Sequence, residues 1–514
     1  MYNPNDQFPY SSSLTRLGVS WITVTHVCHR WRQVALSDPN LWKTVVFDLG
    51  AEWAEEMLAR SKATLIFYSR CLLFLPRVWK RMSIDDEVTL RKHLSHIRRL
   101  VLSGTRESLA PAVRAFNTPA PHLESLELPW NGTQSRESCI TLPSDLFAHN
   151  APKLRHVTLS DCAVPWDSPL FRDLTHLDIR VPPVITFPAP SDLLSIPTLE
   201  RLLDILEAMP SLQVLTLGNC LPRPESTSRV VPLRHMSKLS LDGSLSEIVA
   251  VVQRVSLPGS TSLSLGCLDD NSPDRLDTLV SLLASHFRMP ETPTLPLSTI
   301  VIYKPDYIRS LIIKVWDMGA SLHEPEFKPS SLARLRLSLT FGPARFKALV
   351  ESLPLQICKA LPLRDLQTLS ITCPGTPWSV ADWVDVCIHC PKVAHLHVRR
   401  SWAFTLIPTL IERNVFPSLV TLALQDINFF DSLSPEHKEP LGDALLVTLR
   451  ARRNAGIPVQ CVNLMSCALT DRWVESFKWV VDDVVLDSDQ GDESDSRSSS
   501  TFDRDYDSWS DEDE

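Results

Sequence analysis

Residues 210–217 read PSLQVLTL, and the spacing of their apolar side chains decides the fold. Leu212, Leu215 and Leu217 follow the pattern Φ-x-x-Φ-x-Φ, in which Φ is an aliphatic residue. The last two lie on one face of a short strand, because side chains alternate along an extended chain, whereas the first anchors the turn that enters the strand. Twelve copies of the pattern occur, beginning at Ile97, Leu123, Leu154, Leu174, Leu212, Met236, Leu297, Leu332, Leu366, Val393, Leu419 and Val459.

The copies begin 20 to 61 residues apart, so the array is irregular. In the longest gap, Leu263 and Leu265 of SLSLG predict one further strand. Apolar periodicity also predicts helices over 246–255, 275–287, 344–353, 380–388 and 441–454.

A strand followed by a helix, repeated, resembles the leucine-rich repeat, in which parallel strands stack into a curved array and each unit covers its neighbour's core. The ladder of Asn or Cys that normally follows each strand in that family is largely missing here and is seen only occasionally, as at Cys162 and Asn219-Cys220. We therefore expect an α/β fold, an irregular leucine-rich-repeat solenoid with parallel strands backed by helices.

Residues 21–42 read WITVTHVCHRWRQVALSDPNLW and predict a helix that ends before Pro39. Its apolar residues form a compact stripe at helical spacing; they are Val24, Val27, Cys28, Trp31, Val34 and Ala35. After Pro39, Leu41 and Trp42 are again apolar and are expected to make further apolar contacts. A second amphipathic helix over 52–60 presents Trp53, Met57 and Leu58.

These residues, with a repeat array behind them, resemble the F-box-like family expanded in mushroom-forming fungi, whose members join an F-box to a leucine-rich-repeat region. The resemblance covers about residues 17–42 and implies an adaptor-binding segment, carried by Val27, Cys28, Arg30, Trp31, Pro39, Leu41 and Trp42. Family members begin with a Leu-Pro-x-Glu-Ile-Leu helix, and nothing before Leu17 matches it. We expect either an F-box truncated by a late start or one that has lost its function. Trp31 and Trp42 are expected in the core of the helical hairpin rather than at the adaptor.

The formal net charge of −9 is unevenly distributed. Residues 482–514 hold 14 acidic and two basic side chains, so the remaining chain carries a net charge of +3. This tail has almost no aliphatic residues and is expected to be disordered, either as a solvating extension or as a binding arm that kinases modify. The expected organisation is a disordered N-terminus at 1–16, an F-box-like segment at 17–62, the repeat array at 63–481 and the acidic tail at 482–514.

Several function classes are excluded by the composition. Only 14 of 514 residues are glycine, which disfavours phosphate-binding loops, and no nucleophile elbow, Walker loop or zinc-protease helix is present. Cys387, Cys390, His395 and His397 have a spacing that zinc accepts, but we expect them on a helix, its end and a strand, where they converge poorly. We predict no enzyme activity, no metal and no cofactor.

The partners are expected to be proteins. The near-neutral body disfavours nucleic acid, and no apolar run reaches the length of a membrane span. The N-terminus lacks a secretory signal pattern, which predicts an intracellular protein, cytoplasmic or nuclear.

The F-box resemblance implies a substrate receptor of an SCF-type ubiquitin ligase. Its partners would be a Skp-type adaptor and an unidentified protein target. The alternative is a leucine-rich-repeat scaffold without ligase coupling. The target is expected on exposed positions of the strand face, such as Glu127, Thr158, Asp178, Arg336, His397 and Ala423, while Trp473, Phe477 and Trp479 are expected to cap the last repeat.

Overall fold

The computed structural model describes residues 20–47, 49–72, 86–129, 140–168, 170–181, 196–268, 273–288, 296–305, 310–317, 333–340, 343–412, 415–433 and 439–486. Within these ranges, one sheet contains seventeen strands. They are β1 (Thr44–Val46), β2 (Ile66–Leu72), β3 (Ile97–Gly104), β4 (Ser125–Leu128), β6 (His156–Ser160), β8 (His176–Arg180), β9 (Val214–Gly218), β11 (Lys238–Ser244), β13 (Ser262–Leu268), β14 (Thr299–Tyr303), β15 (Ser310–Trp316), β16 (Leu335–Thr340), β17 (Thr368–Ile371), β18 (His395–Arg399), β19 (Thr421–Gln425), β20 (Cys461–Met465) and β21 (Asp483–Leu486).

All twelve copies of the Φ-x-x-Φ-x-Φ pattern contribute a strand to this sheet, and the SLSLG segment supplies β13. Neighbouring strands pair in parallel from β1 to β13 and from β17 to β21, each with the next strand of the sheet along the chain. The expectation of parallel strands is therefore confirmed for most of the sheet.

The expectation fails at the centre of the sheet. β13 pairs with β16, and β15 lies between β16 and β14 and runs antiparallel to both. β14 then pairs in parallel with β17. The spatial order of β14 and β16 is thus the reverse of their order in the chain. The apolar run at β15 lacks the repeat spacing, so the sequence pattern did not indicate this inserted strand.

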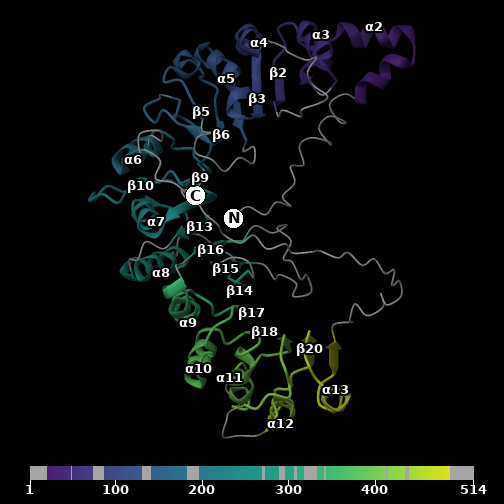
Figure 1. The fold of residues 1–514 in the computed structure, drawn as a ribbon, viewed down its shortest axis with the longest axis vertical. Coiled ribbons are helices and arrows are strands. Elements are labelled where there is room, and N and C mark those ends of the chain that lie inside the picture. The colour runs from purple at the N-terminus through teal and green to yellow at the C-terminus, as the bar shows by residue number, and fades with distance from the viewer. Residues whose placement is uncertain are drawn as a thin grey trace, which may run out of the picture.

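Helices cover one side of the curved sheet, on the outside of the arc, and the strands line its inside (Figure 1). The helices are α2 (His29–Ser37), α3 (Ala51–Ser61), α4 (Asp86–His93), α5 (Arg106–Arg114), α6 (Leu199–Glu207), α7 (Leu245–Val252), α8 (Pro273–Phe287), α9 (Pro343–Ala360), α10 (Val380–His389), α11 (Trp402–Thr409), α12 (Leu441–Asn454) and α13 (Asp471–Lys478). Two short parallel pairs, β5 (Ile140–Thr141) with β7 (Cys162–Ala163) and β10 (Val231–Pro232) with β12 (Val255–Ser256), complete the described elements.

Local sequence explains where several helices begin. Ser244 and Glu247 form a reciprocal capping box at the start of α7, and Ser379 and Asp382 do the same for α10. The five helices predicted behind the repeats are present, although α9 continues to Ala360, well beyond the predicted end. Helices α4, α5, α6, α11 and α13 were not predicted, and of these α5 and α11 contain an internal proline, which disfavours helix by propensity.

The turn that leaves a strand is also repeated. Asp161, Asn219, Arg400, Asp426 and Ser466 each lie seven residues after the first apolar residue of their copy, and each has a positive φ between 50° and 57°. Asp and Asn tolerate this left-handed conformation best among residues with a side chain. The chain therefore turns in the same way after strands that are far apart in sequence.

Cysteines follow this turn at an equivalent position. The Cys220 Sγ donates to the Ile179 carbonyl of the preceding strand at 3.7 Å, and the Cys467 Sγ to the Leu424 carbonyl at 3.3 Å. The Asn219 side-chain amide donates to the Val181 carbonyl at 2.8 Å. These side chains link each turn to the strand or turn that precedes it.

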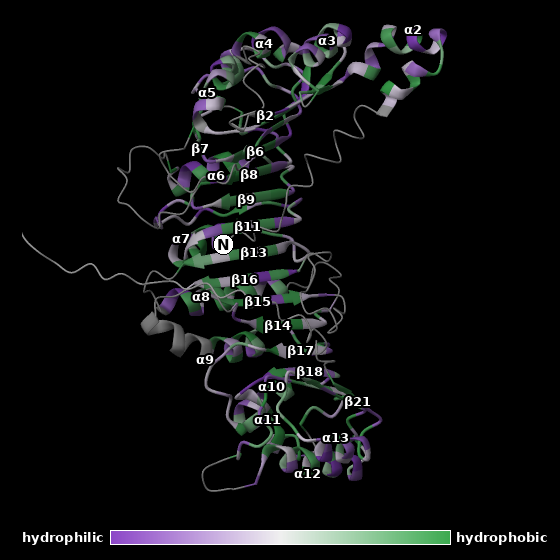
Figure 2. Cartoon of the chain, turned by 45° about the vertical axis from the view of Figure 1, so that its right-hand side comes forward, coloured by the Kyte–Doolittle hydropathy of each residue, from purple (hydrophilic) through white to green (hydrophobic). Residues whose placement is uncertain are grey.

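The core is a continuous layer of aliphatic side chains between the strands and the helices. Figure 2 shows the strands from β6 to β11 largely in green, the colour of apolar residues. At the C-terminal end, Trp473 and Phe477 of α13 are buried as predicted, but Trp479 is 82% exposed. Residues 483–486, predicted to belong to the tail, form strand β21. The expected N-terminal disorder at 1–16 and the rest of the tail, 487–514, lie outside the described residues.

Candidate functional site

The F-box-like segment consists of a 3₁₀ helix (Ser20–His26), α2 and a second 3₁₀ helix (Pro39–Trp42). Trp42 holds these parts together. Its indole is 3% exposed, donates to the Ala35 carbonyl at 3.0 Å and contacts the Trp21 ring edge-on at 4.7 Å. The expectation that Trp42 belongs to the core is confirmed.

Asp38 and Arg60 stabilise the same hairpin. The Asp38 carboxylate accepts from the Asn40 backbone N–H at 3.0 Å and caps the short helix that Pro39 begins. The Arg60 guanidinium stacks 5.0 Å from the Trp42 ring centroid and donates to the Leu36 carbonyl at 3.0 Å. Because Arg60 belongs to α3, these contacts join α2 to the start of the sheet.

The single helix predicted to carry the apolar stripe from Val24 to Ala35 is broken at Val27 and Cys28, between the 3₁₀ helix and α2, and the stripe does not face this core. Val27, Trp31 and Val34 are 62%, 52% and 59% exposed, whereas Ala35 is the buried residue of the helix. Cys28 and Arg30 are also exposed, and Pro39 and Leu41 are half-buried. The reason is that α2 projects from the end of the sheet, where its inner side is already filled by Trp42 (Figure 1). Placing Trp31 in the core was therefore wrong.

Helix α3 departs from its prediction in a smaller way. Met57 and Leu58 are buried against the first strands, but Trp53 is 40% exposed. Apolar spacing indicated the helix correctly, yet spacing alone does not say which apolar residues the sheet covers. The described ends of the molecule therefore both carry exposed tryptophans, at α2 and α3 and beyond α13.

The strand face contains most of the predicted target-binding positions. Glu127, Thr158 and Asp178 lie opposite one another on β4, β6 and β8, and all three are half-buried. Arg336 is exposed, but Ala423 is buried, which corrects its prediction as an exposed position. His397 contacts the Ser370 hydroxyl at 3.0 Å, and burial lowers its pKa to about 4.

The candidate zinc residues do not converge. Among the described residues, no group of three or more His, Cys, Asp or Glu side chains could hold a metal ion. The Cys387 Sγ accepts from the Phe416 backbone N–H at 2.9 Å, and burial raises the pKa values of Cys387 and Cys390. Both thiols therefore act as small core side chains.

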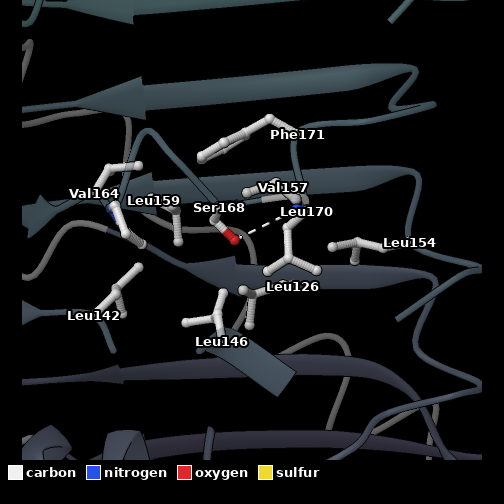
Figure 3. Close-up of a pocket in the computed structure, with 11 residues that line it drawn as sticks. Leu126, Leu142, Leu146, Leu154, Val157, Leu159, Val164, Ser168, Leu170 and Phe171 are labelled. Carbon is white, nitrogen blue, oxygen red and sulfur yellow. Dashed lines mark hydrogen bonds between the residues drawn. The ribbon is translucent and has the colours of Figure 1, made fainter. Parts of the chain in front are cut away.

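A small apolar cavity lies under β4 and β6 (Figure 3). Its volume is about 10 Å³, and Leu126, Val157 and Leu159 are among the side chains that line it. Its polar member, Ser168, uses its hydroxyl oxygen to accept from the Leu170 backbone N–H at 3.4 Å. Ligand sites are commonly about 300 to 1,000 Å³, so this cavity is a packing gap.

Sequence reasoning missed a group of cations where the strands begin. The Lys153 ammonium contacts the His122 imidazole at 3.1 Å, and the His156 and His176 rings stack with centroids 4.3 Å apart. The signal is visible only once strand register is known. Lys153 and His122 each immediately precede the first apolar residue of a copy, and His156 lies opposite His176.

Comparisons with known proteins add no family to these observations. No protein-family model matches the sequence, and no curated protein is significantly similar to it. Among the described helices, none combines the length and apolarity needed to cross a bilayer.

Proposed function

We propose that this chain is the target-recognition subunit of an SCF-type ubiquitin ligase. In this proposal the exposed face of α2 binds a Skp-type adaptor and the strand face captures a protein target. The observation that carries the proposal is the exposed trio Val27, Trp31 and Val34, of which Trp31 and Val34 lie on α2 and Val27 lies in the turn before it, with α2 anchored from behind by Trp42. A receptor of this kind catalyses no bond change; it raises the local concentration of the target at the ligase.

The apolar face of α2 fits a protein contact better than it fits free solvent. Trp31 and Val34 are three residues apart on α2, so they lie along one side of the helix, and exposed Val27 lies in the turn that precedes the helix. Burying a side chain of this size stabilises a complex by about 1.5 to 3 kcal/mol. Arg30 and Arg32 flank the trio and offer charges for the rim of such a contact.

We also propose that the sheet is a leucine-rich-repeat solenoid. Three features that recur along it support this: the Φ-x-x-Φ-x-Φ strands in parallel register, the left-handed residue after the strand, and cysteines that donate to carbonyls of the preceding strand. Arrays of this kind use the strand side as an extended binding surface.

The alternative is a repeat scaffold that captures proteins without ligase coupling. It is supported by the same parallel strand face and requires no contact by α2. The two functions share the strand face and differ only in what α2 binds, so an adaptor-binding experiment separates them.

The experiment is co-purification of the full chain with a Skp-type adaptor, comparing Trp31→Ala with Trp479→Ala. Both tryptophans are exposed, at opposite ends of the molecule. We expect wild type and Trp479→Ala to retain the adaptor. We expect Trp31→Ala to weaken it about 30-fold, because loss of a central aromatic anchor commonly costs about 2 kcal/mol or more.

A charge-introducing pair serves as the matched control. Val34→Glu on α2 should abolish adaptor binding, whereas Val447→Glu on α12, at a similarly exposed valine, should not. Circular dichroism of all four variants checks that each is folded. If wild type retains no adaptor, the ligase coupling is wrong and the scaffold function stands.

A further inference from the structure

Basic side chains collect at the N-terminal edge of the sheet, where strands β3 to β8 begin. Arg99, Ser125, His156 and His176 lie in one row across four adjacent strands. Arg155 precedes His156, and Lys153 and His122 lie in the turns that lead into β6 and β4. Parallel strands lie about 4.8 Å apart, so these groups share one narrow strip of surface.

Two of these cations lack a carboxylate partner among the described residues. The Lys153 ammonium donates to the His122 Nδ1 at 3.1 Å. The Arg155 guanidinium donates to the carbonyls of Leu154 at 2.7 Å and Pro152 at 3.2 Å. These acceptors are an imidazole nitrogen and two backbone carbonyls, and both basic side chains remain accessible to solvent.

The carboxylates on the neighbouring strands are already paired. Glu124 accepts from Arg98 at 2.7 Å, and Glu127 accepts two hydrogen bonds from Arg99 at 2.8 and 3.1 Å. Asp178 accepts from Arg180 at 2.9 and 3.1 Å. These carboxylates balance the positive charges of Arg98, Arg99 and Arg180. They do not pair with Lys153 or Arg155.

The histidine pKa values reflect both burial and the proximity of neighbouring imidazoles. Burial lowers the pKa of His176, and the charge of His156 beside it lowers that pKa further. Burial also lowers the pKa of His96, with a second contribution from the charge of His122. An anion placed over this strip would favour the protonated imidazole of His176, the form that burial disfavours.

We propose that Lys153, Arg155, His122, His156 and His176 form a docking site for an acidic peptide segment of the protein target. This rests on the proposed capture of a target by the strand face and specifies its chemistry. An extended peptide laid across the strands presents side chains on one face about every 6.8 Å. The long Lys153 and Arg155 side chains can follow this spacing, and the imidazoles provide shorter donors between them. Charge complementarity of this kind sets partner choice and speeds association.

The experiment measures binding of a fluorescein-labelled peptide of alternating glutamate and serine to the full chain by fluorescence anisotropy. A glutamine-for-glutamate peptide reports any contribution that is independent of charge. We expect the glutamate peptide to bind wild type more tightly at low salt and to lose affinity as salt rises. The double variant Lys153→Glu/Arg155→Glu should weaken it at least about tenfold, since like charges would then face the peptide.

Lys392→Glu is the matched control, because Lys392 occupies the same repeat position before β18 but pairs with Asp365. Equal affinity of all three chains would overturn the proposal, as would equal binding of the glutamine peptide. A zero-length cross-link between Lys153 and a carboxylate of residues 487–514 would assign the strip to the chain's own terminus and overturn an external partner. Since no adaptor is present, failure here leaves the ligase coupling of α2 untouched, and loss of adaptor binding leaves this result untouched.

Discussion

The segments APKLRHVTL (151–159) and CPKVAHLHV (390–398) share a Pro-Lys start and the same apolar spacing, in regions far apart along the sheet. Their inward side chains behave alike. Leu154, Val157 and Leu159 are buried in the first, and Val393, Leu396 and Val398 in the second. Each strand is followed by a left-handed residue, Asp161 or Arg400. The apolar positions therefore fix the same backbone in both regions.

The outward side chains differ between the two regions. Lys153 meets the His122 imidazole of the preceding copy, whereas Lys392 meets the Asp365 carboxylate at 2.6 Å. His122 and Asp365 occupy the same position in their copies. One residue choice thus decides whether a lysine on the same backbone is neutralised or remains available to a partner. The buried apolar positions of each copy thus determine the backbone, whereas the outward positions determine the charge that is offered to a proposed partner.

If the buried side chains of the two regions pack in the same way, shortening an equivalent leucine should reduce local stability by a similar amount in both. Leu126 on β4 and Leu396 on β18 occupy the same repeat position and are fully buried. Leu126→Ala and Leu396→Ala should each reduce local stability by about 2 to 5 kcal/mol. Leu126→Ala should be the costlier of the two, because it enlarges the cavity that Leu126 already lines.

Hydrogen exchange of peptides covering β4 and β18 is the suitable measurement, because long repeat arrays often unfold in parts rather than in one step. Each variant should speed exchange at its own strand. An effect below about 1 kcal/mol at either strand would mean that the regions are packed differently and would break the comparison.

The turn after the strand offers the next contrast. Asp426 pairs with Arg399 at 2.6 Å, but Asp161 has no side-chain partner among the described residues, and burial raises the pKa of Asp161 from 3.8 to about 6. A raised carboxyl pKa means that the folded state retains a proton that the unfolded chain loses between about pH 4 and 6. The ionised Asp161 therefore destabilises the fold at neutral pH and has no such cost at lower pH.

Asp161→Asn should accordingly stabilise the protein by up to about 3 kcal/mol at pH 7.5, and the gain should vanish below about pH 4. Asn suits the left-handed turn, as Asn219 shows at the equivalent position. Asp426→Asn should instead destabilise at pH 7.5, because it removes a charged acceptor from Arg399. Thermal unfolding across this pH range tests both variants, and the same sign for the two would contradict the assignment of Asp161.

The sequence was sufficient for features that depend on local spacing. Every Φ-x-x-Φ-x-Φ copy became a strand, and Leu441–Asn454 formed a helix with the bounds that its periodicity predicted. Features that depend on what lies opposite a side chain were not predicted. The exposure of Trp31, the burial of Ala423 and the insertion of β15 all follow from neighbours that are distant in the chain.

The candidate sites show the same division. The residue pattern indicated helical structure between residues 21 and 42, but which of these residues face outward depends on the packing of Trp42 and Arg60. The sequence did not predict the basic strip of Lys153, Arg155, His122, His156 and His176, because Lys153 and His122 are 31 residues apart and become neighbours only through strand register. Aligning the copies and reading the residue before each first apolar position would have brought His122, Lys153, Asp365 and Lys392 into one column.

Exchanging the residues at this aligned position, His122 and Asp365, should give the smallest change in stability of the variants proposed. His122→Asp gives Lys153 the kind of partner that Asp365 gives Lys392, and Asp365→His makes the reverse change. Since these side chains are exposed, each ion pair is worth only about 0.2 to 1 kcal/mol. His122→Asp should raise the melting temperature slightly, and Asp365→His should lower it slightly. The effect on binding should be larger, because His122→Asp places a carboxylate inside the strip that is proposed to hold acidic peptides. Unchanged affinity for the glutamate peptide in His122→Asp would show that Lys153 does not contact the peptide, even if the stability changes have the expected signs.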